Sequence, residues 1–174
     1  MVTSMASALL GKPSVLAIFA VASLVLGPVA HAVSRRRGWR PGFAVTAAVG
    51  LALAIAVTQG RHPVELTGLN FTECTLTSSG SGPSEALLNL IMLMPMAFFA
   101  VLATRRTLGP IVLCLATSGL AELTQAVFNT GGCTGQDVLT NSTGAALAAC
   151  SGWILLNLAR RKRIRPSPPA TQHR

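Results

Sequence analysis

The sequence has few charged residues and no tyrosine. Only 11% of its 174 residues are Asp, Glu, Lys or Arg, whereas a soluble domain usually has about 25%. So few charges leave too little polar surface to cover a soluble globule of this size. The apolar fraction of 51% excludes intrinsic disorder. Length excludes a second large soluble domain, because the apolar segments described below use most of the chain. These figures predict an integral membrane protein.

Acidic residues are the rarer of the two kinds of charged residue. Five Asp and Glu stand against 14 Lys and Arg, which gives a formal net charge of +9. In a soluble domain such an excess would point to nucleic acid. In an apolar chain it marks the cytoplasmic flanks of membrane helices. We therefore expect a lipid bilayer as the partner and no nucleic acid.

Five apolar segments are each long enough to cross a bilayer. Each has about 17–21 residues, close to the roughly 20 that span about 30 Å of hydrocarbon. The runs are continuously apolar rather than alternating, which favours helices over strands. The expected fold is an all-α, polytopic membrane helix bundle with five transmembrane helices. Its spans are Pro13–Val33, Gly42–Thr58, Glu85–Ala103, Gly109–Phe128 and Asn141–Ala159.

The basic residues fall on alternate connections between these spans. Twelve of them follow the first, third and fifth spans, and the other two are Lys12 and Arg61. The positive-inside rule then predicts an N-out/C-in orientation. The twelve are Arg35, Arg36, Arg37, Arg40, Arg105, Arg106, Arg160, Arg161, Lys162, Arg163, Arg165 and Arg174.

Three regions follow from this arrangement. Residues 1–12 form an extracytoplasmic flank, residues 13–159 form the transmembrane domain, and residues 160–174 form a basic, proline-rich cytoplasmic tail. An alternative for the first span is a cleavable secretion signal, because a Gly27-Pro28 break and a short Ala-His-Ala stretch follow its apolar run. The four arginines after this span favour an uncleaved helix.

Each of the two outer loops carries one cysteine, Cys74 and Cys133. Both would face an oxidising compartment, so we predict a disulfide between them, with free thiols as the alternative. Cys114 and Cys150 lie inside spans and are read as apolar packing residues. No CxxC pair and no Cys/His spacing suited to zinc is present. We expect no metal and no cofactor.

Polar residues at membrane depth are the candidate site. Glu122 lies inside the fourth span, where an ionisable residue is costly and by default marks function. Five side chains are predicted to converge near one depth below the outer surface: Asn89, Glu122, Gln125, Asp137 and Asn141. Two interpretations stay open. The cluster is either a ligand pocket or a set of interhelical hydrogen bonds with no chemical role.

Other residues are assigned structural roles. Pro95, in the middle of the third span, is predicted to kink its helix. Gly144 begins a row of small residues at four-residue spacing in the fifth span, which lets helices approach closely.

The polar residues also resemble a known family. Asn89 followed by Pro95, the Glu122-Leu-Thr-Gln125 element and the segment from Asp137 through Asn141 to Gly144 are similar to motifs of the VanZ-like membrane proteins. The similarity covers about residues 84–153. Two features depart from it: residues 129–136 contain no basic residue, and Ala97 stands where the family usually has glycine.

The resemblance implies a small multi-pass protein of the bacterial plasma membrane. The family is named for an accessory protein associated with low-level teicoplanin resistance. We therefore expect an outer-face pocket that binds an envelope component or a glycopeptide antibiotic. One alternative is an intramembrane lipid-processing enzyme with Glu122 and Asp137 as an acid/base pair. Another is a small proton-coupled transporter with Glu122 as the proton carrier. The oligomeric state is left open.

Overall fold

The computed structural model describes residues 11–60, 75, 83–128 and 133–164. Within these ranges the chain folds into helices and no strand, which confirms the predicted all-α class. Five segments are long and apolar enough to cross a membrane, as predicted, when the consecutive α4 and α5 are taken as one span. The helices are α2 (Pro13–Arg37), α3 (Pro41–Gly60), α4 (Pro83–Met92), α5 (Met94–Thr104), α6 (Leu108–Phe128) and α7 (Gly135–Ile164).

A tight turn joins the first two helices. Gly38 ends α2 with φ 66°, a left-handed conformation that glycine adopts without steric cost. The Trp39 N–H donates to the Ser34 carbonyl across this turn. At the other ends of the two helices, the Ser14 hydroxyl donates to the carbonyl of Gly60 at 3.0 Å. α2 and α3 therefore form an antiparallel hairpin fixed at both ends.

The third span is divided into two helices. The sequence predicts one helix from Glu85 to Ala103 with a kink at Pro95, but α4 ends at Met92 and α5 begins at Met94. Proline has no N–H and its ring clashes with the carbonyl four residues earlier, so the helical hydrogen bonds are interrupted just before it. Leu93 stands between the two helices, and its carbonyl accepts the Ala97 N–H.

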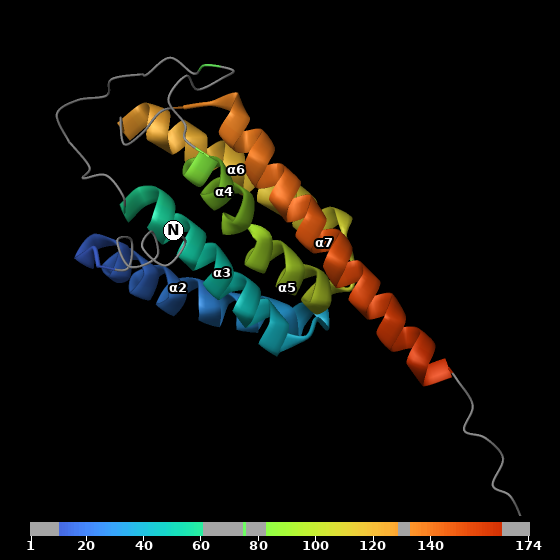
Figure 1. Cartoon of the computed structure of the whole chain (residues 1–174). Helices are drawn as coiled ribbons and strands as arrows, with labels where there is room; N and C mark the ends of the chain where they lie inside the picture. Colours follow the sequence, from blue (N-terminus) through green and yellow to red (C-terminus); the bar gives the residue numbers. More distant parts are fainter. Residues whose placement is uncertain (1–10, 61–74, 76–82, 129–132, 165–174) are drawn as a thin grey trace, which may run out of the picture.

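The helices pack as two groups that meet through α3 and α5 (Figure 1). α2 packs mainly on α3, and α3 packs on α5. α7 lies along α4, α5 and α6 and is the helix that holds them together. The main buried cluster comes from α3, α4, α5, α6 and α7 and includes Ala54, Leu93, Met96, Cys114 and Ala148.

Two helices, α2 and α7, extend at least a full turn beyond the predicted spans, whereas the other bounds differ by no more than two residues. α7 begins at Gly135, six residues before the predicted start at Asn141, and continues to Ile164. α2 continues through the basic run to Arg37. Hydropathy marks the part of a helix that lies in lipid, whereas the helix itself ends where its capping groups are. Asp137 is therefore part of the first turn of α7 and not of a loop.

Candidate functional site

The predicted site residues lie where α4 and α7 begin and α6 ends. We call this the acidic end, because it carries the described acidic residues Glu85, Glu122 and Asp137, and we call the opposite end the basic end. Polar side chains from three helices gather at the acidic end. This polar cluster consists of Asn89 on α4, Ser118, Glu122 and Gln125 on α6, and Thr134, Asp137 and Asn141 at the start of α7. All are buried except Asp137, which is half-buried.

Thr134 caps the N-terminus of α7. Its hydroxyl oxygen accepts the backbone N–H of Asp137 at 3.2 Å. A threonine followed three residues later by an acidic residue is the sequence pattern of a helix N-cap. The sequence prediction missed Thr134, although this pattern was present in Thr134-Gly-Gln-Asp137.

The Glu122 carboxylate contacts the same helix start. Its Oε2 accepts the backbone N–H of Thr134 at 2.9 Å. The residue is only 6% exposed, so this carboxylate is withdrawn from solvent as well as from lipid. An anionic group is stabilised at a helix N-terminus, where backbone N–H groups and the helix dipole both face it. The position at the start of α7 therefore offsets part of the cost of burying Glu122.

Asn89 and Asp137 form a direct hydrogen bond between α4 and α7. The Nδ2 of Asn89 donates to Oδ1 of Asp137 at 2.6 Å. Both residues belong to the motifs that resemble the VanZ-like family, and they lie 48 positions apart in the chain. The bond joins the short helix α4 to the first turn of α7.

Asn141 lies one turn deeper on α7 and is 2% exposed. Its Nδ2 donates to the Ser118 hydroxyl oxygen on α6 at 3.1 Å. Its Oδ1 is buried and accepts no hydrogen bond from any described residue. An unsatisfied buried acceptor costs about 1–3 kcal/mol. Asn141 is therefore the place in the polar cluster where a further donor would be stabilised.

Four of the five predicted residues form hydrogen-bonded pairs in the structure. Two of their partners, Ser118 and Thr134, were not among the predicted five. Asn89 pairs with Asp137, Glu122 with Thr134, and Asn141 with Ser118. Gln125 is buried on α6, but no hydrogen bond between described residues joins it to the other four. The chain's other two acidic residues, Glu65 and Glu73, were not among the predicted site residues and lie outside the described residues.

A cavity of about 420 Å³ adjoins the polar cluster between α3, α4 and α6. Its walls are mainly apolar, and Ser118 is the member of the polar cluster that lines it. None of the five predicted site residues lines this cavity. A hydrogen bond of 2.8 Å from Gln59 Nε2 to the Thr124 hydroxyl joins α3 to α6 beside it. This cavity therefore meets the polar cluster at Ser118.

Backbone hydrogen bonds tie Thr75, which lies between α3 and α4 in the chain, to the start of α7. Thr75 forms a parallel bridge with Thr134. Its N–H donates to the Cys133 carbonyl at 3.0 Å, and its carbonyl accepts the Gly135 N–H at 2.9 Å. Among the described cysteines, Cys114 and Cys150 are free. The predicted partner Cys74 lies outside the described residues, so this pairing remains a prediction.

The described residues contain no group of three His, Cys, Asp or Glu side chains that could hold a metal ion. The arrangement is one of carboxylates, amides and hydroxyls in hydrogen-bonded pairs. Such a set can bind and orient a polar group, and it can exchange a proton at a carboxylate.

Comparison with known proteins adds one match. The model of the VanZ/LLP1 family matches residues 60–156, which is more than half of the chain and includes the whole polar cluster. No curated protein and no solved structure shows significant similarity to the chain. α2 and α3 precede the matched region, apart from the last residue of α3.

Proposed function

The chain belongs to the VanZ/LLP1 family, and we propose that it binds a component of the cell envelope through the polar cluster at its acidic end. The protein is a multi-pass membrane protein with five apolar helices that can span the bilayer. We place it in the bacterial plasma membrane. Its binding of an envelope component would contribute to low-level, teicoplanin-type glycopeptide resistance.

The observation that carries this proposal is the buried Oδ1 of Asn141, which has no donor among the described residues. Interhelical hydrogen bonds alone do not account for it, because a cluster built only to join helices would satisfy its buried acceptors. A hydroxyl or amide of a ligand that reaches Ser118 would lie close to this oxygen, since Ser118 and Asn141 are hydrogen-bonded to each other.

The adjoining cavity favours one of the candidate ligands. Its walls are mainly apolar, with Thr58, Thr117 and Ser118 among the polar exceptions. An apolar cavity that ends at a few polar groups suits an amphipathic molecule. A lipid-linked wall precursor has this character, with a hydrocarbon part in the membrane and a polar part at its surface. We therefore favour it over a glycopeptide as the molecule bound directly.

Glycopeptide susceptibility, measured with and without the gene, tests the proposal through two variants of Glu122. Glu122→Gln keeps an oxygen that can accept the Thr134 N–H, so we expect most of the protection to persist. Glu122→Leu removes the acceptor, and we expect susceptibility to rise to that of the strain without the gene. Glu85→Gln, a change at an exposed acidic residue in the first turn of α4, is the matched control and should have no effect.

The same variants separate binding from chemistry. An acid/base enzyme or a proton-coupled transporter needs the ionisable carboxylate of Glu122, so Glu122→Gln would abolish either activity. Loss of protection in Glu122→Gln, with normal protein levels, would therefore contradict the binding proposal and favour one of these two classes. Wild-type susceptibility in the strain without the gene would contradict the resistance role.

We also propose an N-out/C-in orientation, which places the polar cluster at the outer surface. The described basic residues in the last turn of α2 and directly after it, after α5 and at the end of α7 all lie at the basic end, as the positive-inside rule requires of a cytoplasmic face. A reporter that is active only outside the cytoplasm should be active when fused after Asn129 and inactive when fused after Arg163. The reverse pattern would overturn the orientation.

A Cys74–Cys133 disulfide is the third part of the proposal. Cys74 directly precedes Thr75 and Cys133 directly precedes Thr134, and these two threonines are bridged through their backbones. We expect reduction to change the electrophoretic mobility of the protein. Cys74→Ser and Cys133→Ser should each abolish this change, whereas Cys150→Ser, at an exposed free thiol, should not. A mobility change that survives either of the first two substitutions would refute the pairing.

A further inference from the structure

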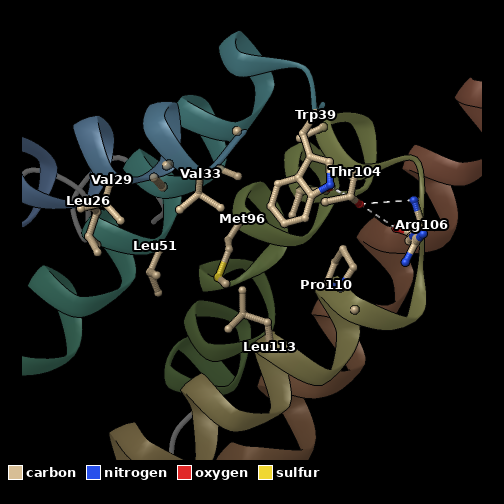
Figure 2. Close-up of a pocket in the computed structure, with 17 residues that line it drawn as sticks. Leu26, Val29, Val33, Trp39, Leu51, Met96, Thr104, Arg106, Pro110 and Leu113 are labelled. Carbon is tan, nitrogen blue, oxygen red and sulfur yellow. Dashed lines mark hydrogen bonds between the residues drawn. The ribbon is translucent and has the colours of Figure 1, made fainter. Parts of the chain in front are cut away.

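A second cavity lies at the basic end, between α2, α3, α5 and α6 (Figure 2). Its volume is about 430 Å³. Aliphatic side chains and small alanines form its walls. They include Leu26 and Val33 on α2, Leu51 on α3, Met96 on α5, and Pro110 and Leu113 on α6. Interiors of proteins are otherwise packed as densely as organic crystals, so an apolar hollow of this size calls for an apolar occupant.

The polar groups of this cavity are confined to one side of it. Trp39, Thr104 and Arg106 lie there together, as Figure 2 shows. The turn after α2 is held at this place because the Arg40 N–H donates to the Ala103 carbonyl at 3.2 Å. The Arg106 N–H donates to the Thr104 hydroxyl oxygen, also at 3.2 Å, which fixes the turn after α5. The cavity therefore has a hydrocarbon interior and a rim with a tryptophan and a cation.

The charge around the rim has one sign. Six exposed arginines surround this end of the bundle, and the described acidic residues all lie at the acidic end. An anion is the group that such a rim would attract. Anionic phospholipids in the cytoplasmic leaflet are drawn to basic side chains at the membrane surface. The six are Arg35, Arg36, Arg37, Arg40, Arg105 and Arg106.

We propose that this cavity binds one acyl chain of an anionic glycerophospholipid, whose headgroup phosphate contacts Arg106. The apolar walls accept the chain, Trp39 lies at the depth of the glycerol region, and the arginines select the negative headgroup. A second copy of the protein in the same orientation would bring a second set of arginines to the same depth, where the two sets would repel each other. α2 and most of α3 lie outside the family match, so this site extends beyond the proposed function.

The two tryptophans of the chain provide the test. Trp39 lines the cavity, whereas Trp153 lies on the surface of α7 and is 53% exposed. In the Trp153→Phe variant the remaining tryptophan, Trp39, reports on lipid in the cavity. In the Trp39→Phe variant the remaining tryptophan, Trp153, reports on lipid at the ordinary protein surface. The full chain is placed in phosphatidylcholine vesicles that contain increasing fractions of a phospholipid brominated near the glycerol end of its acyl chains. Tryptophan fluorescence then reports contact with the brominated lipid.

We expect Trp39 to be quenched at several-fold lower fractions of brominated phosphatidylglycerol than of brominated phosphatidylcholine. Arg106→Gln should lower this preference about fivefold, the factor that one cation near a membrane surface contributes. Arg161→Gln, at an exposed arginine of α7 away from the cavity, is the matched control. Ala100→Phe, which fills the cavity, should reduce quenching of Trp39 and leave quenching of Trp153 unchanged.

Two results would overturn the proposal. One is quenching of Trp39 with the same dependence on both lipids, which would mean that the rim does not select charge. The other is protection of Trp39 from both brominated lipids, which would mean that protein covers the cavity. Neither result bears on glycopeptide susceptibility or on Glu122, so this proposal and the proposed function fail independently.

Discussion

Replacing Gly144 with alanine is expected to destabilise the bundle more than the same change at any other described glycine. A Cβ on Gly144 would collide with the carbonyl oxygen of Leu90 on α4 and lie 2.8 Å from the carbonyl carbon. Backbone atoms cannot turn away as a side chain can, so α4 and α7 would have to separate. Overpacking of this kind typically costs about 1–3 kcal/mol and occasionally more.

The measurement is the temperature at which the detergent-solubilised protein loses its folded, monodisperse form. Two other glycine substitutions give a graded comparison. Gly152→Ala adds a Cβ 3.2 Å from the Phe98 carbonyl oxygen, so we expect a smaller loss. Gly119→Ala adds one that meets nothing within 4 Å and should cause no loss. Equal stability of the Gly144 and Gly119 variants would contradict the close approach of α4 and α7.

Breaking the Asn89–Asp137 hydrogen bond is expected to have the second largest effect. Asn89→Leu leaves the Asp137 carboxylate without the amide that it accepts at 2.6 Å. Asp137→Ala leaves the buried Asn89 amide without its acceptor. Leaving a buried polar group such as the Asn89 amide without a partner costs about 1–3 kcal/mol. Because both variants break the same bond, the double variant should lose less stability than the sum of the two single losses.

The same thermal measurement provides the coupling energy. Double-mutant cycles between membrane helices average about 0.6 kcal/mol, with a maximum of about 1.7, and we expect a value toward the upper part of this range. Thr143→Ala is the control, because this exposed α7 side chain bonds only to the Leu139 carbonyl of its own helix. Additive losses would show that the bond contributes nothing to the packing of α4 on α7.

The fold was predictable because the bilayer allows a spanning segment very few structures. A run of about 20 apolar residues can cross the membrane only as a helix, so the apolar runs along the sequence located all five spans. The positions of the helix ends were not predictable in this way. The early start of α7 depends on the Thr134 cap, and the division of the third span at Leu93 depends on how Pro95 interrupts its hydrogen bonds. These are local hydrogen-bonding events that hydropathy does not measure.

The candidate site was predictable as a group of residues but not as a set of bonds. Predicted depth in the membrane placed Glu122 near Asn89 and Asp137, but it did not single out Ser118 or Thr134 as their neighbours. The actual pairs depend on the rotation and register of α4, α6 and α7 against one another. Glu122, for example, accepts the backbone N–H of Thr134. The residue type does not predict a contact of this kind, because every residue except proline has a backbone N–H.

The break at Leu93 has a mechanical consequence. α4 is joined to α5 through a single non-helical residue, but it is joined to α7 through the Asn89–Asp137 bond and the close approach at Gly144. The half of the third span at the acidic end is thus joined to α7 by a side-chain hydrogen bond and a close backbone approach, and to its own continuation through the one residue Leu93. Because α7 also packs along α5, a load applied along α7 would move both halves of the third span, and any bending between them would be taken up at Leu93.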